Sequence, residues 1–148
     1  IILARVLALF RPRRYPRPQD IQGIDQQALR GAGLSRAKAA AIKDLAEKTL
    51  EGIVPPSTRA LEKLSDEEIV SRLTAVRGIG PWTVEMLLIF RLARPDVLPA
   101  TDYGVRKGFA RVRGAKDLPA PKALLQWGER WRPYRSVASW YLWRVLDL

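Results

Sequence analysis

The segment at residues 78–81, Gly-Ile-Gly-Pro, constrains the fold of this chain more than any other segment. Pro81 has no backbone N–H and suits the first turn of a helix, whereas glycines end a helix readily, permit positive φ and allow another backbone to approach closely. Ser65 and Glu68 have capping-box spacing, which places the start of the preceding helix at about residue 65. The sequence therefore predicts two helices joined by a short hairpin, over about residues 65–93.

Apolar residues recur at helical spacing along almost the whole chain, and alternating strand patterns bounded by turns are missing. We therefore predict an all-α fold with a single domain over residues 1–148. The stretch 136–143 has almost no charge on any face, so the last helix is expected to be largely buried, and Trp127 and Trp140 are expected in the core. Beside the hairpin, we expect helices at 1–10, 25–30, 35–51, from 102 to about 112, at 121–130 and at 134–147, with a proline-rich loop at 11–20.

Basic residues outnumber acidic ones: 26 Lys and Arg stand against 15 Asp and Glu, which leaves a net charge of +11. Such an excess attracts polyanions and favours nucleic acid as the partner, although solvated basic faces share it. No apolar run approaches the roughly 20 residues that a membrane span needs. We therefore expect no membrane contact, a monomer, and an intracellular location, either cytoplasmic or associated with the bacterial nucleoid.

The chain contains neither cysteine nor histidine. This excludes disulfides, iron–sulfur clusters, thiol nucleophiles, cysteine- and histidine-ligated metals and imidazole acid–base chemistry. Any catalysis must therefore rest on carboxylate, lysine, hydroxyl or backbone groups. We expect no metal and no cofactor, although a monovalent cation could bind at the hairpin.

The hairpin turn offers an anion-binding site made of backbone groups. The amides of Gly78, Ile79 and Gly80, together with the N-terminus of the following helix, are expected to point at solvent, with Arg77 and Thr83 beside them. A DNA phosphate would fit such a site without any reading of base sequence. The alternative is an ordinary helix end that is followed by a proline start and binds nothing.

Several segments resemble one family of DNA repair enzymes. Val76–Met86 is similar to the helix-hairpin-helix of the DNA glycosylase superfamily named for that hairpin, a Gly/Pro-rich loop and an aspartate, and Leu98–Tyr103 is similar to its aspartate segment. The resemblance covers nearly the whole chain and implies a helix-hairpin-helix DNA glycosylase-like domain, with the aspartate segment at about 98–112. Three further segments are similar to the 3-methyladenine DNA glycosylase II branch of this superfamily. They are residues 33–39 (Gly-Leu-Ser-Arg-Ala-Lys-Ala), 81–83 (Pro-Trp-Thr) and 131–136 (Trp-Arg-Pro-Tyr-Arg-Ser).

Asp102 is the candidate catalytic residue. Its simplest role is that of an N-cap for the next helix, and the helix N-terminus together with Arg106 would keep its carboxylate ionised. Cleavage of an N-glycosidic bond develops positive charge on the deoxyribose, which a fixed anion stabilises. The resemblance assigns the family's catalytic aspartate to Asp102.

Aromatic residues are candidates for a pocket around a flipped base. By resemblance, Trp82, Tyr103 and Trp143 line this pocket, where their π faces would stack on a cationic purine. Met86 also belongs to the expected pocket. It stands where the 3-methyladenine DNA glycosylase II branch has an aromatic residue. The pocket is therefore expected to be wider, or to prefer a different base.

The resemblance implies base-excision repair by hydrolysis of the N-glycosidic bond of alkylated purines, such as 3-methyladenine and 7-methylguanine, in double-stranded DNA. No partner acid for Asp102 stands out, and Glu85 is expected on a solvated face or in an ion pair. A base that alkylation has made cationic leaves without a general acid. Such a substrate agrees with a site that has only one candidate catalytic carboxylate. Trp82 occupies the position of the lysine that forms a Schiff base in lyase-competent relatives, so we expect a monofunctional enzyme.

Two other interpretations fit part of the pattern. A non-catalytic helix-hairpin-helix DNA-binding module would use the same hairpin and charge without needing Asp102 and its aromatic neighbours, and a basic helical scaffold would bind no nucleic acid. Nothing caps the helix at residue 1, and the family's usual preceding helix, with the segment that helps to invade the duplex, is absent from the sequence. We therefore expect an N-terminal portion to be missing.

Overall fold

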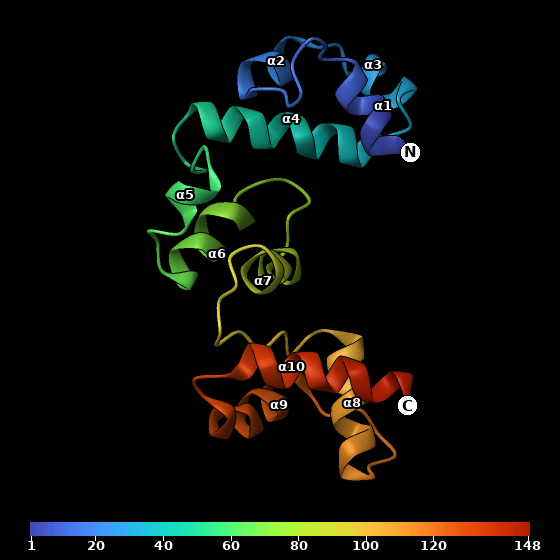
Figure 1. Cartoon of the computed structure of the whole chain (residues 1–148), viewed down its shortest axis with the longest axis vertical. Coiled ribbons are helices and arrows are strands. Elements are labelled where there is room, and N and C mark those ends of the chain that lie inside the picture. Colours follow the sequence, from blue (N-terminus) through green and yellow to red (C-terminus); the bar gives the residue numbers. More distant parts are fainter. The chain divides into compact units, whose positions relative to one another are not determined.

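The computed structural model describes all residues from 1 to 148 and contains only helices joined by loops (Figure 1). The predicted all-α fold is confirmed. The chain divides into two compact units, Ile1–Gly80 and Pro81–Leu148. A single domain over the whole chain stays a prediction. No helix combines the length and the apolar character that crossing a lipid bilayer requires.

The helices are short, apart from α4. The first unit contains α1 (Ile2–Ala8), α2 (Pro18–Gly23), α3 (Gln26–Gly31), α4 (Arg36–Leu50), α5 (Thr58–Leu61) and α6 (Asp66–Thr74). The second unit contains α7 (Pro81–Phe90), α8 (Tyr103–Arg113), α9 (Pro121–Gly128), the 3₁₀ helix η1 (Glu129–Trp131), α10 (Arg135–Arg144) and the 3₁₀ helix η2 (Val145–Asp147).

Side-chain caps set the starts of two helices in the first unit. At α6, Ser65 Oγ accepts a hydrogen bond from the N–H of Glu68 at 3.2 Å, and Glu68 Oε2 accepts one from the N–H of Ser65 at 3.0 Å. At α4, Ser35 Oγ accepts from the N–H of Lys38 at 3.2 Å. Each cap satisfies amides that a helix start leaves without an intrahelical partner. Both predicted starts are confirmed.

Three other helix limits differ from the prediction. The loop predicted at 11–20 ends earlier, because Pro18 takes the first position of α2 and Asp20 accepts a hydrogen bond from the N–H of Arg17 at 2.9 Å. Helices α6 and α7 end about one turn before the predicted limits. Backbone hydrogen bonds that depart from the α-helical pattern follow each end: the N–H of Val76 donates to the carbonyl of Leu73 after α6, and the N–H of Leu92 donates to the carbonyl of Leu87 after α7.

The core of the first unit lies between α4 and the three helices before it. Helices α1, α2 and α3 lie along one side of α4 (Figure 1). Lys43 and Gln22 tie α4 to α2, because Lys43 Nζ donates to the carbonyl of Gln22 and Gln22 Nε2 donates to that of Lys43, both at 2.8 Å. The buried apolar cluster consists of Val6, Phe10, Leu29, Ala32 and Ala39.

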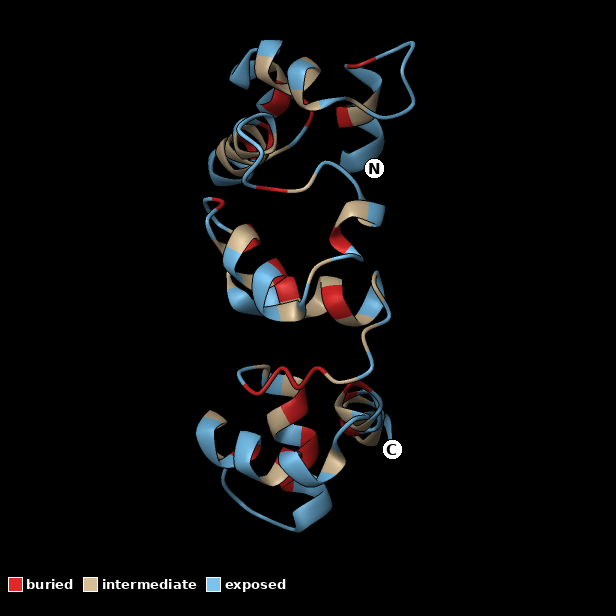
Figure 2. Cartoon of the chain, turned by 90° about the vertical axis from the view of Figure 1, so that its left-hand side faces the viewer, coloured by how far each residue is buried: buried red, intermediate tan, exposed pale blue.

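The core of the second unit gathers around α8. Buried residues occur on α8 and α10 and also along the loop before α8, at Val97, Leu98 and Ala100 (Figure 2). Gly108 permits α10 to approach α8 at backbone distance, since a Cβ there would lie 1.9 Å from the carbonyl oxygen of Leu142. The cluster consists of Leu98, Ala100, Val105, Phe109, Leu124 and Leu142, with Trp127, Trp131 and Trp143 packed against it.

Helix α10 is only half-buried, so the prediction that it would be largely buried is wrong. Ser136, Ser139 and Leu142 are buried along one stripe, whereas Trp140 and Tyr141 are 49% and 63% exposed. The prediction that Trp140 belongs to the core is therefore also wrong, although Trp127 packs against the core as predicted. Absence of charge makes burial inexpensive, but the neighbouring elements decide which face is covered.

We predict that Gly108→Ala destabilises the second unit. The added Cβ would force α8 and α10 apart, and the free energy of unfolding should fall by about 3 kcal/mol in urea denaturation. The control is Gly31→Ala at the end of α3, where nothing lies within 4 Å of an added Cβ. This variant should match the wild type or gain about 0.5 kcal/mol. Equal stability of the two variants would contradict the prediction.

Candidate active site and hairpin loop

The carboxylate of Asp102 lies at the N-terminus of α8, where three donors hold it. Its Oδ1 accepts hydrogen bonds from the backbone N–H of Val105 and from Nε1 of Trp143, both at 2.8 Å. Its Oδ2 accepts from Nε1 of Trp82, also at 2.8 Å. The N-cap role predicted for Asp102 is confirmed. The structure thus brings two of the predicted pocket residues, from α7 and α10, onto the predicted catalytic carboxylate.

These hydrogen bonds keep Asp102 ionised. Partial burial opposes its charge, but the bonds from the backbone and from the two indoles outweigh that cost, so the pKa of Asp102 lies below its ordinary value of 3.8. Arg106, expected to favour the charged form, instead donates from Nε to the carbonyl oxygen of Pro119 at 2.9 Å. The carboxylate is therefore stabilised by N–H dipoles and not by a paired cation.

Gly104 leaves the room that the indole of Trp143 occupies. A Cβ at this position would lie 2.8 Å from Cδ1 of Trp143 and 3.1 Å from Oδ1 of Asp102. Phe90 stacks on the same indole, with ring centroids 5.6 Å apart and planes inclined by 28°. Gly104 and Phe90 were not among the predicted site residues. A glycine in the first turn of a helix is the signal that points to such a close approach.

The loop that leads to Asp102 is held by the first turn of α10. Ser136 Oγ accepts a hydrogen bond from the N–H of Val97 at 2.9 Å. Arg135 Nε donates to Asp96 Oδ1 at 2.6 Å, and this bond is the main reason why the pKa of Asp96 lies below its ordinary value. The end of the Trp-Arg-Pro-Tyr-Arg-Ser segment thus fixes the loop that leads to Asp102.

Glu85 lies near Asp102 in the second unit, and the sequence prediction missed its burial. It follows Trp82 by three residues and therefore shares a face of α7 with it. Its carboxyl is half-buried, and its Oε2 is buried without a hydrogen-bond partner. Burial first, and then the negative charge of Asp102, raise the pKa of Glu85 from 4.5 to about 7. The expected solvated face or ion pair is wrong; a glutamate inside the apolar run of α7 was the available signal.

The other predicted pocket and phosphate residues of the second unit take no part in this network. Tyr103 is 62% exposed, and Lys107 Nζ lies 5.7 Å from the centroid of its ring. Met86 is half-buried on α7, and Thr83 is exposed in the first turn of that helix. Their roles toward a base or a phosphate stay predictions.

The hairpin loop of the first unit contains a tight turn over residues 76–79. The N–H of Ile79 donates to the carbonyl oxygen of Val76 at 3.1 Å, and Gly78 has a φ of +79°, which favours glycine. Gly80 does not have positive φ, and nothing lies within 4 Å of a Cβ added there. Of the two glycines that would permit positive φ, only Gly78 adopts it.

Asp44 anchors this loop to α4. Its Oδ2 accepts a hydrogen bond from the N–H of Arg77 at 2.5 Å, and its Oδ1 accepts one from Lys48 Nζ at 3.1 Å. The amides of Arg77 and Ile79 are thus used inside the protein, and the expectation that the Ile79 amide points at solvent is wrong. The amides of Gly78 and Gly80 donate to no protein acceptor, so two donors remain for an anion.

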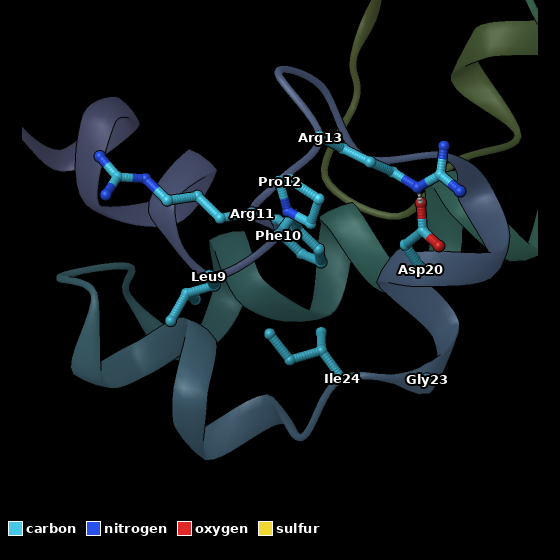
Figure 3. Close-up of a pocket in the computed structure, with 8 residues that line it drawn as sticks. All are labelled: Leu9, Phe10, Arg11, Pro12, Arg13, Asp20, Gly23 and Ile24. Carbon is cyan, nitrogen blue, oxygen red and sulfur yellow. Dashed lines mark ion pairs between the residues drawn. The ribbon is translucent and has the colours of Figure 1, made fainter.

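Two cavities beside the loop differ in character. Ile79 lines an apolar cavity of about 240 Å³ together with residues of α4, and Arg77 lines one of about 450 Å³ with Arg36 and Gln26. The second cavity brings two guanidinium groups close to the loop. A third cavity, of about 360 Å³, lies at the end of α1 and contains none of the predicted site residues (Figure 3).

Residues 2–133 match the HhH-GPD superfamily of base excision DNA repair proteins, and the chain belongs to this family. It is 39% identical over 147 residues to DNA-3-methyladenine glycosylase 1 of Schizosaccharomyces pombe, covering 99% of this chain and 64% of that protein. It is 29% identical to DNA-3-methyladenine glycosylase 2 of Escherichia coli, covering 87% of this chain and 42% of that protein. The chain thus spans less than two thirds of these curated relatives.

Two solved structures share the fold. The S. pombe 3-methyladenine DNA glycosylase in complex with abasic DNA superposes with a TM-score of 0.85 at 38% identity, covering 99% of this chain and 71% of that one. A DNA-3-methyladenine glycosidase from Bacillus halodurans superposes with a TM-score of 0.84 at 34% identity, covering 97% and 64%. The helix-hairpin-helix glycosylase-like fold predicted from the sequence is confirmed.

We predict that Glu85→Gln changes stability in a pH-dependent way. An unfolded chain ionises Glu85 near pH 4.5, whereas the folded protein keeps the proton up to about pH 7. Between these values the wild type loses stability as the pH rises, because only the folded state holds the proton. The free energy of unfolding of Glu85→Gln relative to the wild type should therefore rise from pH 4.5 to 7 and then level off.

Urea denaturation at pH 4.5, 6, 7 and 8.5 measures this difference. Glu47→Gln, at an exposed position of α4, is the matched control for the loss of a carboxylate. A constant difference between Glu85→Gln and the wild type over this range would contradict the prediction.

Proposed function

We propose that this protein is a DNA glycosylase that hydrolyses the N-glycosidic bond of alkylated purines in double-stranded DNA and acts as a monomer. The observation that carries the proposal is the ionised carboxylate of Asp102, held by two indole N–H groups at 2.8 Å. A deoxyribose that loses its base develops positive charge at C1′, and a fixed carboxylate lowers the energy of that state. The family to which the chain belongs carries out base excision repair.

The same arrangement supports the choice of a cationic base. Trp82 directs its N–H edge to Asp102 and is 48% exposed, so its π face remains for a base. Trp143 also donates to Asp102, and Phe90 covers one face of its indole, which leaves the opposite face. A π face attracts a positively charged ring more strongly than a neutral one. Alkylation at N3 of adenine or N7 of guanine makes the purine cationic, so 3-methyladenine and 7-methylguanine are the proposed substrates.

We propose that the enzyme is monofunctional. The lyase step of related enzymes needs a lysine amine that attacks C1′, and Trp82 occupies that position in this chain. Trp82 instead donates a hydrogen bond to Asp102. The product should therefore be an intact strand with an abasic site.

The hairpin loop is the proposed contact with the DNA backbone. Gly78 and Gly80 have amides without protein acceptors, and Arg36 and Arg77 line a cavity beside them. Backbone amides and guanidinium groups bind phosphate oxygens without reading the base sequence. The net charge of +11 adds an attraction that salt should weaken.

Asp102→Asn should abolish base release while DNA binding persists. The amide keeps the size of the side chain but removes the charge, so the single-turnover rate of 7-methylguanine release should fall at least about 100-fold. Affinity for an abasic duplex should change less than about threefold, because the hairpin loop is untouched. Strand integrity before and after alkali tests the monofunctional product in the same samples.

The matched control for this variant is Asp117→Asn, at an exposed position after α8. Strong release by Asp102→Asn would contradict the role of Asp102, and breaks before alkali would contradict a monofunctional enzyme. Salt-sensitive DNA binding by a wild type that releases no base would instead favour a non-catalytic DNA-binding module.

Gly80→Leu should weaken binding to any duplex by about tenfold, which corresponds to about 1.4 kcal/mol. The protein has open space for a side chain at this position, so the loss would come from the approach of the DNA backbone. Gly31→Leu, also in open space but outside the loop, is the control. Dissociation constants for undamaged and abasic duplexes measure the effect. Unchanged affinity of Gly80→Leu would rule out this loop as the phosphate contact.

A further inference from the structure

Helix α4 supports the hairpin loop through a hydrogen bond and through packing. Asp44 Oδ2 accepts a hydrogen bond from the N–H of Arg77 at 2.5 Å. A Cβ added to Gly78 would lie 3.6 Å from the Cβ of Ala41, which is an ordinary packing distance. Ala41 and Asp44 are three residues apart and therefore share one face of α4. The conformation of the loop thus depends on this face of a helix that lies more than 25 residues earlier in the chain.

The hydrogen bond to Asp44 helps to decide which amides of the loop remain for a ligand. It holds the N–H of Arg77, and the N–H of Ile79 is used to close the turn. The amides of Gly78 and Gly80, which alternate with these two, donate to no protein acceptor. Successive amides of the loop therefore differ in role, and only the two glycine amides are left to bind an anion.

A carboxylate beside an anion-binding loop is not explained by attraction to DNA, because its charge repels a phosphate. Lys48 Nζ lies 3.1 Å from Oδ1 of Asp44 and offsets part of this charge. The hydrogen bond from the N–H of Arg77 is the main reason why the pKa of Asp44 lies below its ordinary value of 3.8. Asp44 is therefore ionised at neutral pH, and its acceptor oxygen is the feature that serves the loop.

We propose that Asp44 is a positioning residue that sets the affinity of the hairpin loop for the DNA backbone. It fixes the loop before DNA arrives, in the conformation that leaves the amides of Gly78 and Gly80 to phosphate oxygens. Donors that are ordered in advance bind more tightly than donors that must be ordered on binding. This inference rests on the proposed contact between the hairpin loop and DNA, and it names the residue of another helix on which that contact depends.

The acceptor oxygen of Asp44 can be separated from its charge by two variants. Asp44→Asn keeps an oxygen that can accept from the N–H of Arg77 but loses the charge, whereas Asp44→Ala loses both. Removal of a negative charge should by itself strengthen binding to DNA in both variants. Loss of the acceptor should weaken binding in Asp44→Ala alone, so the two effects have opposite signs.

Dissociation constants for an undamaged duplex and an abasic duplex of one sequence measure these effects. Asp44→Ala should bind both duplexes about tenfold more weakly than the wild type, because the loop is no longer ordered in advance. Asp44→Asn should bind as tightly as the wild type or up to about threefold more tightly. Glu47→Ala removes an exposed carboxylate from the same helix, and this matched control should not weaken binding.

Single-turnover release of 7-methylguanine shows whether the loss in Asp44→Ala is confined to binding. At protein concentrations that saturate the DNA, the rate should stay within about threefold of the wild type, because Asp102 and its donors are untouched. At concentrations below saturation, the rate should fall about tenfold, in proportion to the affinity. A general loss of folded protein would instead lower both rates.

The backbone amides of the wild type give a readout that does not depend on any variant. When a duplex is added, the N–H chemical shifts in the loop should change most at Gly78 and Gly80. The N–H of Arg77 should remain protected from hydrogen exchange in the complex, because it stays bonded to Asp44.

Unchanged or tighter binding by Asp44→Ala, an equal loss in Asp44→Asn, or loss of protection at the N–H of Arg77 in the complex would each overturn the role of Asp44. In these cases release of 7-methylguanine by the wild type would leave the glycosylase function standing. Weaker binding by Asp44→Ala alone, with a wild type that releases no base, would overturn that function and support the role of Asp44. A wild type that binds no duplex would overturn both.

Discussion

The close approach of α8 and α10 at two glycines is the constraint on which the site depends. Gly104 and Gly108 are four residues apart and therefore share one face of α8. The carbonyl oxygen of Leu142 occupies the space of a missing Cβ at Gly108, and the indole of Trp143 occupies the space at Gly104. Only at this separation can Trp143 bond to Asp102 across the two helices. The position of the carboxylate thus follows from the absence of two side chains.

Two carboxyls that are both partly removed from water differ in protonation state, because only one of them has hydrogen-bond donors. Asp102 stays charged because the N–H groups at a helix start and on two indoles replace the lost solvent. Glu85 has no such donors, so burial and the charge of Asp102 hold its proton up to about pH 7. A charged and a neutral carboxyl can therefore coexist within one cluster, in a chain that contains neither histidine nor cysteine.

Structural features that depend on only a few neighbouring residues were predictable from the sequence. The capping box at Ser65 and Glu68, the cap at Asp102 and the positive φ of Gly78 each follow from local backbone chemistry. The state of Glu85 and the anchor from Asp44 to the hairpin loop depend on contacts between distant segments, which spacing does not reveal. The prediction that α10 would be largely buried was wrong for the same reason, because the apolar character of a helix does not determine which of its faces a neighbour covers.

The hydrogen bonds of the tryptophans limit how this site can distinguish bases. Trp82 and Trp143 have one N–H each, and both are bonded to Asp102. Neither edge is therefore available to read the hydrogen-bonding pattern of a base, and only the ring faces remain for stacking. Stacking responds to the charge and area of a base more than to its identity. Selection should therefore rest on the charge and the area of the base.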